Sequence, residues 1–125
     1  MTPPQKHILV VEDSAELRDA VRIMLVDAGF EVSLAEDGEQ ALRLLEDDRV
    51  PDAVLVDVLM PGMDGAEFLT RMREQPRLAD VRVGVMTGIA TSLVAKLLRA
   101  DVFLYKPFDE RELLQAIREL LRAPR

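Results

Sequence analysis

The 125-residue chain has no cysteine and a single histidine, His7. Without cysteine there can be no disulfide, no thiolate nucleophile and no Cys-ligated zinc, which fits a reducing compartment. Basic residues are also in deficit, since the net charge is −7. Because phosphate backbones are bound by clustered Lys and Arg, this balance argues against a nucleic-acid or anionic-membrane surface. Any partner of the acidic faces is therefore expected to be a protein.

Long hydrophobic runs are absent as well. The N-terminal segment leads into an apolar run, 7–11, that is far shorter than a signal-peptide core or a membrane span. We therefore expect a soluble, cytoplasmic protein. Its length fits one domain, which we place at 7–122 between an N-terminal tail, 1–6, and a C-terminal tail, 123–125.

Short β-branched runs alternate along the chain with segments of helical periodicity. This is the pattern of a parallel sheet with helices on both faces. Strands are expected at 7–11, 31–35, 53–57, 81–86 and 102–105. Each is followed by a helical segment, but the fourth, Thr91–Leu98, is barely two turns long. The sequence thus predicts an α/β protein with a five-stranded doubly wound sheet and five helices, the fourth of them shortened.

Four expected helix starts carry an aspartate followed three residues later by Glu or Gln. The pairs are Asp13–Glu16, Asp37–Gln40, Asp64–Glu67 and Asp109–Glu112. This is the spacing of a capping box, with Asp as the capping residue. Asp13, taken alone, could therefore be no more than a helix cap.

Asp57 interrupts an apolar run, 53–60, where a bare buried carboxylate would cost several kcal/mol. Glu12 and Asp13 end the first apolar run in the same way. Ligands of a doubly wound sheet bind at the carboxyl ends of its strands, so these acids should converge on one edge. Packed carboxylates repel one another unless a cation lies between them. Mg²⁺, which prefers oxygen ligands, suits such a cluster.

Thr87 and Lys106 also fall at strand ends, on the same predicted edge. Alone, Thr87 is a common strand residue and Lys106 a surface lysine. Together with a metal ion, the lysine would attract a further anion. A phosphoryl group is the natural candidate, with an aspartate as the attacking oxygen. His7 lies about 16 Å away, at the other end of the first strand, so a phosphohistidine donor would have to come from another protein.

The chain resembles a response-regulator receiver domain over essentially its whole length. The resemblance rests on four motifs: Glu12-Asp13, the run Asp57-Val58-Leu59-Met60-Pro61-Gly62-Met63-Asp64-Gly65, Thr87-Gly88, and Lys106-Pro107-Phe108. It implies the flavodoxin-like fold with strand order 2-1-3-4-5 and a cis bond between Lys106 and Pro107. It also implies a phosphoacceptor that catalyses only its own phosphorylation and dephosphorylation, and is not otherwise an enzyme.

Residue by residue, the resemblance makes Asp57 the phosphoacceptor for a sensor histidine kinase or a histidine phosphotransfer protein. Glu12, Asp13, Asp57 and the backbone carbonyl of Leu59 would hold Mg²⁺. Thr87 would bond a phosphoryl oxygen, Lys106 would pair with the phosphate, and Phe103 would turn inward on activation. The modified domain, a monomer or transient dimer, would then change its contacts with an unknown downstream protein, whether it acts alone or as part of a longer chain.

Two departures from the family pattern concern switching and dephosphorylation. The fourth helix is about one turn short, and Arg99 stands where a glycine commonly precedes the last strand. Leu59 and Ile89 occupy positions where polar side chains in some members help to place the attacking water. We therefore expect slow loss of the phosphoryl group.

Three rival interpretations remain at this point. A degenerate receiver would serve as a docking module without phosphorylation. An aspartate-nucleophile phosphatase of another family would need a second acid where this chain has Leu59. A flavodoxin-like electron carrier would need a hydroxyl- and glycine-rich first loop, whereas this chain offers Glu12-Asp13.

Overall fold

The computed structural model describes residues 5–47, 49–57, 65–88 and 100–122. Its strands are β1 (His7–Val11), β2 (Glu31–Ala35), β3 (Ala53–Asp57), β4 (Arg82–Thr87) and β5 (Val102–Tyr105). They form one parallel sheet in the order β2-β1-β3-β4-β5. The expected fold and strand order are confirmed. The fourth strand lies one residue further along than predicted and ends on Thr87.

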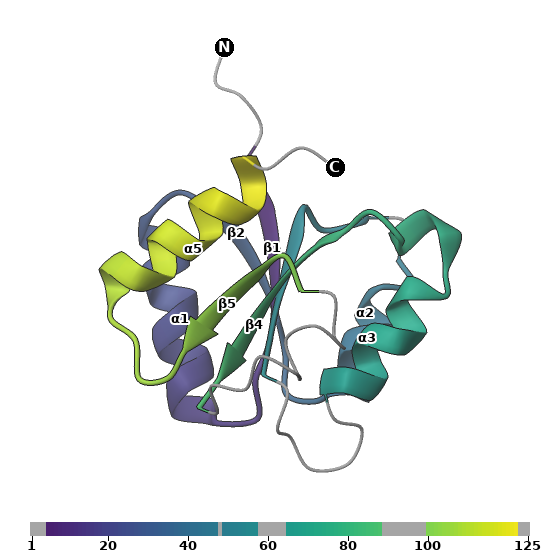
Figure 1. Cartoon of the computed structure of the whole chain (residues 1–125), viewed down its shortest axis with the longest axis horizontal. Coiled ribbons are helices and arrows are strands. Elements are labelled where there is room, and N and C mark those ends of the chain that lie inside the picture. Colours follow the sequence, from purple (N-terminus) through teal and green to yellow (C-terminus); the bar gives the residue numbers. More distant parts are fainter. Residues whose placement is uncertain (1–4, 48, 58–64, 89–99, 123–125) are drawn as a thin grey trace.

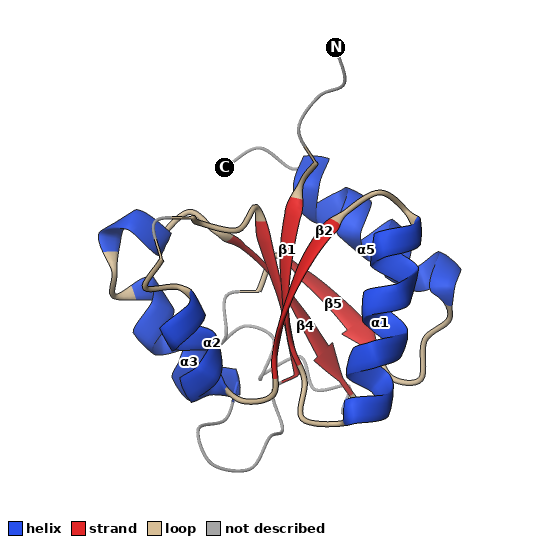
Figure 2. Ribbon diagram, turned by 180° about the vertical axis from the view of Figure 1, so that it is seen from behind, coloured by secondary structure: helices blue, strands red, loops and turns tan. Residues whose placement is uncertain are grey.

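Helices cover both faces of the sheet. They are α1 (Ala15–Asp27), α2 (Gly38–Leu44), α3 (Gly65–Arg73) and α5 (Glu110–Arg122), with a short 3-10 helix, η1 (Pro76–Leu78), before β4. α1 and α5 lie on one face, and α2 and α3 on the other (Figures 1 and 2). The predicted short helix at 91–98 lies outside the described residues. No helix in the described ranges has the length and apolarity needed to cross a bilayer.

The central strands β1 and β3 are buried at every position because apolar residues follow one another along them, rather than alternating with polar ones. In β1, Ile8 and Val10 pack with the α1 and α5 side chains, whereas Leu9 and Val11 pack with those of α2 and α3. All four are at most 1% exposed. Each such side chain contributes about 1.5–3 kcal/mol relative to its exposed state. The strands are thereby held rigidly, and so are the residues at their ends.

Two of the predicted capping boxes are confirmed. The carboxylate of Asp37 accepts a hydrogen bond from the backbone N–H of Gln40 at the start of α2. At α5, Asp109 and Glu112 exchange the two reciprocal bonds of the motif. Asp64, the predicted cap of α3, lies outside the described residues.

The predicted capping role of Asp13 at α1 is wrong by one residue. The cap is Ser14, whose Oγ accepts a hydrogen bond from the Leu17 N–H at 3.3 Å. The Ser14 N–H itself donates to Glu12 Oε2 at 3.0 Å, which turns the chain tightly after β1 and delays the helix start. The side chain of Asp13 is exposed and is not used as the cap.

Candidate functional site at the carboxyl edge of the sheet

Strand register places Glu12 and Asp57 side by side. Val11 is paired with Val56, so Glu12, which follows β1, and Asp57, the last residue of β3, lie at the same level of the sheet. Glu12 is fully buried and Asp57 is 5% exposed. The backbone N–H of Glu12 donates to the Ala35 carbonyl at 3.0 Å, which fixes the position of Glu12 at the end of β1. Two carboxylates are thus confined together at one edge of the sheet, as the sequence predicted.

Lys106 reaches this pair from the end of β5. Its ammonium lies 2.8 Å from Glu12 Oε1 and 3.1 Å from Asp57 Oδ2. Its backbone N–H donates to the Thr87 carbonyl at 2.8 Å, which fixes the point at which the chain leaves the sheet. The bond between Lys106 and Pro107 is cis, as the resemblance implied. The lysine therefore bridges the two buried acids directly.

Asp13 completes a cluster of three acids. One carboxylate oxygen from each of Glu12, Asp13 and Asp57 lies within 4.8 Å of the other two. Oxygen ligands at this spacing, partly buried and partly open to solvent, fit a small hard divalent cation such as Mg²⁺. The predicted fourth ligand, the carbonyl of Leu59, lies outside the described residues.

The electrostatics of the cluster also favour a bound cation. Burial raises the pKa of Glu12, and the nearby Asp13 and Asp57 carboxyls act in the same direction, although hydrogen bonds from Lys106 and the Ser14 N–H partly offset them. Burial acts to lower the pKa of Lys106, but its bonds to Glu12 and Asp57 outweigh that effect and the pKa is raised. Lys106 thus stays charged and supplies one positive charge against three carboxylates.

Thr87 and Phe103 lie where the sequence placed them. Asp57 is paired with Met86, so Thr87, the last residue of β4, lies at the same edge one position further along. It is 5% exposed. Phe103, in β5, is half-buried and packs against the core cluster on the α2 and α3 side. The proposed switching roles of the two residues stay predictions.

Sequence reasoning missed two residues that shape the acidic loop. Besides capping α1, Ser14 donates its N–H to Glu12. The guanidinium of Arg18 donates to the backbone carbonyl of Glu12 at 2.8 Å and to that of Asp13 at 3.5 Å. A serine just before a helical stripe is a recognisable cap signal. Arg18 gave no such signal, because its role depends on how the helix lies over the loop.

His7, by contrast, opens β1 at the opposite edge of the sheet and is not part of the acidic site. This prediction is confirmed. Its ring Nε2 lies 2.6 Å from Ser33 Oγ, and its backbone N–H donates to Asp52 Oδ2 at 2.7 Å.

The fold and the site together define a doubly wound α/β domain with an acidic, lysine-bridged centre at the carboxyl edge. The family model described as response regulator receiver domain matches residues 8–118. The chain belongs to the response-regulator receiver family of two-component signalling proteins.

Full-length relatives and solved structures agree with this assignment. The response regulator MprA of Mycolicibacterium vanbaalenii is 41% identical over 93% of this chain and 50% of its own length. The transcriptional regulatory protein CpxR of Escherichia coli is 37% identical over 92% of this chain and 49% of its own length. The chain therefore spans about half the length of these relatives.

Among solved structures, the chemotaxis protein CheY4 of Vibrio cholerae matches with a TM-score of 0.90 and 31% identity, covering 94% of this chain and all of its own. The receiver domain of the sensor histidine kinase PA1611 of Pseudomonas aeruginosa matches with a TM-score of 0.86 and 28% identity, over 96% of this chain and all of its own. The latter structure has a magnesium ion coordinated in its active-site cleft.

Proposed function

We propose that this receiver domain accepts a phosphoryl group on Asp57 from a phosphohistidine, in a Mg²⁺-dependent reaction, and then changes its contacts with a downstream protein. The phosphohistidine would belong to a sensor histidine kinase or a histidine phosphotransfer protein. The observation that carries this proposal is the lysine-bridged cluster of Glu12, Asp57 and Lys106, with Asp13 beside it. The reaction would take place in the cytoplasm.

The transfer would use a carboxylate oxygen of Asp57 as the nucleophile. An O–P bond forms as the N–P bond of the donor breaks, and the leaving imidazole nitrogen keeps the electron pair and takes up a proton. The negative charge on the three phosphoryl oxygens must be neutralised in the transition state. The Lys106 ammonium lies 3.1 Å from Asp57 Oδ2. It would pair with the negative charge of the phosphoryl group as that group moves onto Asp57. Thr87 would donate a hydrogen bond to a phosphoryl oxygen.

Glu12, Asp13 and Asp57 would hold Mg²⁺ together with the Leu59 carbonyl. When bound, the ion supplies charge neutralisation and orients the phosphoryl oxygens. The spacing of the three acids supports this assignment, as does the magnesium in the PA1611 receiver structure. Arg18 and Ser14 would keep the acidic loop in the conformation that the ion needs.

Phosphorylation would be read out through Thr87 and Phe103. Drawing the Thr87 hydroxyl toward the phosphoryl group leaves space behind it, into which Phe103 would turn. The changed surface would then bind a different protein, in this chain or in a partner. The relatives are about twice as long as this chain. The downstream protein or domain that responds to phosphorylation is therefore proposed only as a class, a protein surface that binds the modified receiver.

The experiment is intact-mass measurement after incubation with acetyl phosphate and Mg²⁺. We expect the wild type to gain the mass of one phosphoryl group, mapped to Asp57, and to gain none when Mg²⁺ is chelated. Asp57→Ala should abolish the gain. Asp19→Asn, which changes an exposed acid paired with Arg22 on α1, should leave it intact. An unmodified wild type would identify the domain as a degenerate docking module.

A further inference from the structure

We propose that Arg18 is a positioning residue that raises the selectivity of the acidic site for Mg²⁺ over Ca²⁺. The inference rests on the proposed function, because it concerns the ion that Glu12, Asp13 and Asp57 would hold. Arg18 lies near the start of α1, and its guanidinium reaches back to the loop that carries the first two of these acids. It would act on the ion through its ligands, without touching it.

The first support is the kind of acceptor that Arg18 binds. Its Nη1 donates to the backbone carbonyl of Glu12 at 2.8 Å and to that of Asp13 at 3.5 Å. Among the described residues, the Arg18 side chain donates to these carbonyls and to no carboxylate. It therefore fixes the backbone of the acidic loop without neutralising an acid of the site.

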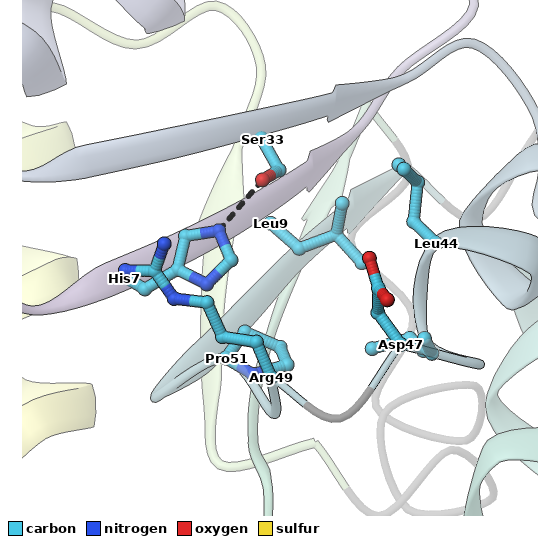
Figure 3. Close-up of a pocket in the computed structure, with 8 residues that line it drawn as sticks. His7, Leu9, Ser33, Leu44, Asp47, Arg49 and Pro51 are labelled. Carbon is cyan, nitrogen blue, oxygen red and sulfur yellow. Dashed lines mark hydrogen bonds between the residues drawn. The ribbon is translucent and has the colours of Figure 1, made fainter.

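Other arginines that lie beside acids behave differently. Arg22 binds the carboxylate of Asp19 on the surface of α1. Arg49, which lines a cavity at the amino edge of the sheet (Figure 3), binds the carboxylate of Glu31. In both pairs the guanidinium neutralises an acid. The backbone contacts of Arg18 thus set it apart from these two arginines.

The second support is the number of restraints on the same short loop, 12–14. The Glu12 N–H donates to the Ala35 carbonyl at 3.0 Å, and the Ser14 N–H donates to Glu12 Oε2 at 3.0 Å. Because Arg18 binds the carbonyl of Glu12, the N–H, the carbonyl and the side chain of that residue are all restrained. Arg18 also ties the loop to α1, whose apolar side chains pack on the sheet. The acids are thereby held at a fixed spacing.

A rigid set of oxygen ligands favours the smaller ion. Mg²⁺ requires near-ideal octahedral geometry with oxygens at about 2.0–2.1 Å, whereas Ca²⁺ accepts roughly six to eight oxygens at about 2.3–2.6 Å in adaptable geometry. A loop released from Arg18 could widen around the larger ion. It could also turn toward that ion the carbonyls of Glu12 and Asp13, which Arg18 binds in this structure.

The positive charge of Arg18 does not explain such a selectivity. A guanidinium near the site repels every divalent cation, and Mg²⁺ and Ca²⁺ carry the same charge. Removing that charge would raise both affinities by the same factor. The ratio of the two dissociation constants therefore separates the positioning effect of Arg18 from its charge.

The test is calorimetric titration of the wild type and of Arg18→Met with MgCl₂ and with CaCl₂ at equal ionic strength. Arg18→Met should lower the Mg²⁺ affinity about tenfold, the smaller end of the loss that follows removal of a residue holding a metal ligand in place. The Ca²⁺ affinity should fall by less than about twofold, because a relaxed loop can offer Ca²⁺ further oxygens. Equal changes in the two affinities, or an unchanged Mg²⁺ affinity, would overturn the inference.

Two control variants separate this effect from charge and from stability. Arg22→Met removes the same charge one helical turn further along α1, from an exposed ion pair with Asp19, and should keep the wild-type ratio. Asp37→Ala removes the cap of α2 and lowers stability without touching the acidic loop. It should also keep the ratio. A ratio that falls in either control as it does in Arg18→Met would overturn the assignment to Arg18.

The same titrations distinguish this inference from the proposed function. A wild type that binds neither ion would overturn both, because the metal site itself would be absent. A wild type that binds Mg²⁺, together with an Arg18→Met variant of unchanged ratio, would overturn the role of Arg18 alone.

Discussion

The two ends of β1 both bury an ionisable side chain, but they treat it differently. At the amino end, the pKa of His7 is lowered so that the ring is neutral, and the neighbouring ions, Arg49 and Glu31, are paired at the surface. At the carboxyl end, Glu12 is fully buried beside Asp57 and shares a single ammonium group with it. One end avoids buried charge, whereas the other concentrates it. A concentration of like charge is unfavourable for folding and is therefore informative about function.

The largest effect on stability is expected from removing the bridging ammonium. Lys106→Met leaves Glu12 and Asp57 close together without their shared cation. Without Mg²⁺, the free energy of unfolding measured in urea should fall by about 2 kcal/mol. This is less than the roughly 3–5 kcal/mol lost on breaking a fully buried ion pair, because the Lys106 side chain is 27% exposed. Added Mg²⁺ should restore more stability to this variant than it adds to the wild type.

The control for that variant comes from the other end of the same strand. Lys6 is exposed just before β1, so Lys6→Met should change the free energy of unfolding by less than about 0.5 kcal/mol. Equal losses in the free energy of unfolding of the two variants would show that Lys106 stabilises the fold no more than an exposed lysine does.

The next effect separates metal binding from helix capping. Asp13→Ala should weaken Mg²⁺ binding roughly tenfold or more, through loss of one carboxylate ligand, and leave the fold intact. Ser14→Ala should do the reverse, with a loss of about 1 kcal/mol in stability and little change in metal affinity, because alanine loses the capping hydroxyl but keeps the backbone N–H that bonds Glu12. Calorimetric titration and urea unfolding measure the two quantities. A large loss of stability in Asp13→Ala would contradict this assignment and indicate that Asp13, rather than Ser14, caps α1.

Loss of the phosphoryl group is expected to be slow, and one polar side chain should quicken it. Leu59→Asn should raise the decay rate of phosphorylated Asp57 about fivefold, because an amide can orient the attacking water where an aliphatic side chain cannot. Decay is followed by intact mass after removal of acetyl phosphate. Leu59→Met, which stays aliphatic, is the control and should decay as the wild type does. Rapid decay of the wild type itself would contradict this idea.

The smallest effect is on pH dependence, where the two ends of β1 should act with opposite sign. The folded pKa of His7 is lowered, so its contribution to stability is complete above the ordinary value of 6.5 and is lost as the pH falls below it. The folded pKa of Glu12 is raised, so its contribution is complete below the ordinary value of 4.5 and is lost as the pH rises through the folded value.

Urea unfolding between pH 4 and pH 8 without Mg²⁺ measures both contributions. His7→Leu should reduce the loss of stability that occurs as the pH falls below 6.5, and Glu12→Gln should reduce the loss that occurs as the pH rises above 4.5. The control is Glu39→Gln, which changes an exposed acid. This variant is expected to show both pH-dependent losses of stability, as the wild type does. If His7→Leu or Glu12→Gln shows the same pH-dependent loss of stability as the wild type, the residue it replaces is not the cause of that loss.

Much of the fold was predictable because the signals were local. The apolar runs located all five strands to within one residue, and the Asp-to-Gln and Asp-to-Glu spacings located the caps of α2 and α5. The same spacing failed at Asp13, because the competing bond from the Ser14 N–H to Glu12 forms only once β1 has positioned that carboxylate. Arg18 was missed for a similar reason. Its hydrogen bonds join helix α1 to the end of strand β1. Hydrophobic periodicity along the sequence gives no indication of such a contact.

The order of residue types along this chain was sufficient to determine a parallel α/β sheet with Glu12, Asp13, Asp57, Thr87 and Lys106 at its strand ends. This follows because hydrophobic periodicity fixes which segments pair and which face inward. Only the tertiary structure decided that the Lys106 ammonium bridges Glu12 and Asp57, and that the His7 ring meets the Ser33 hydroxyl on the neighbouring strand. Both depend on distances between side chains from separate strands and loops, which are set by packing and register rather than by any local pattern.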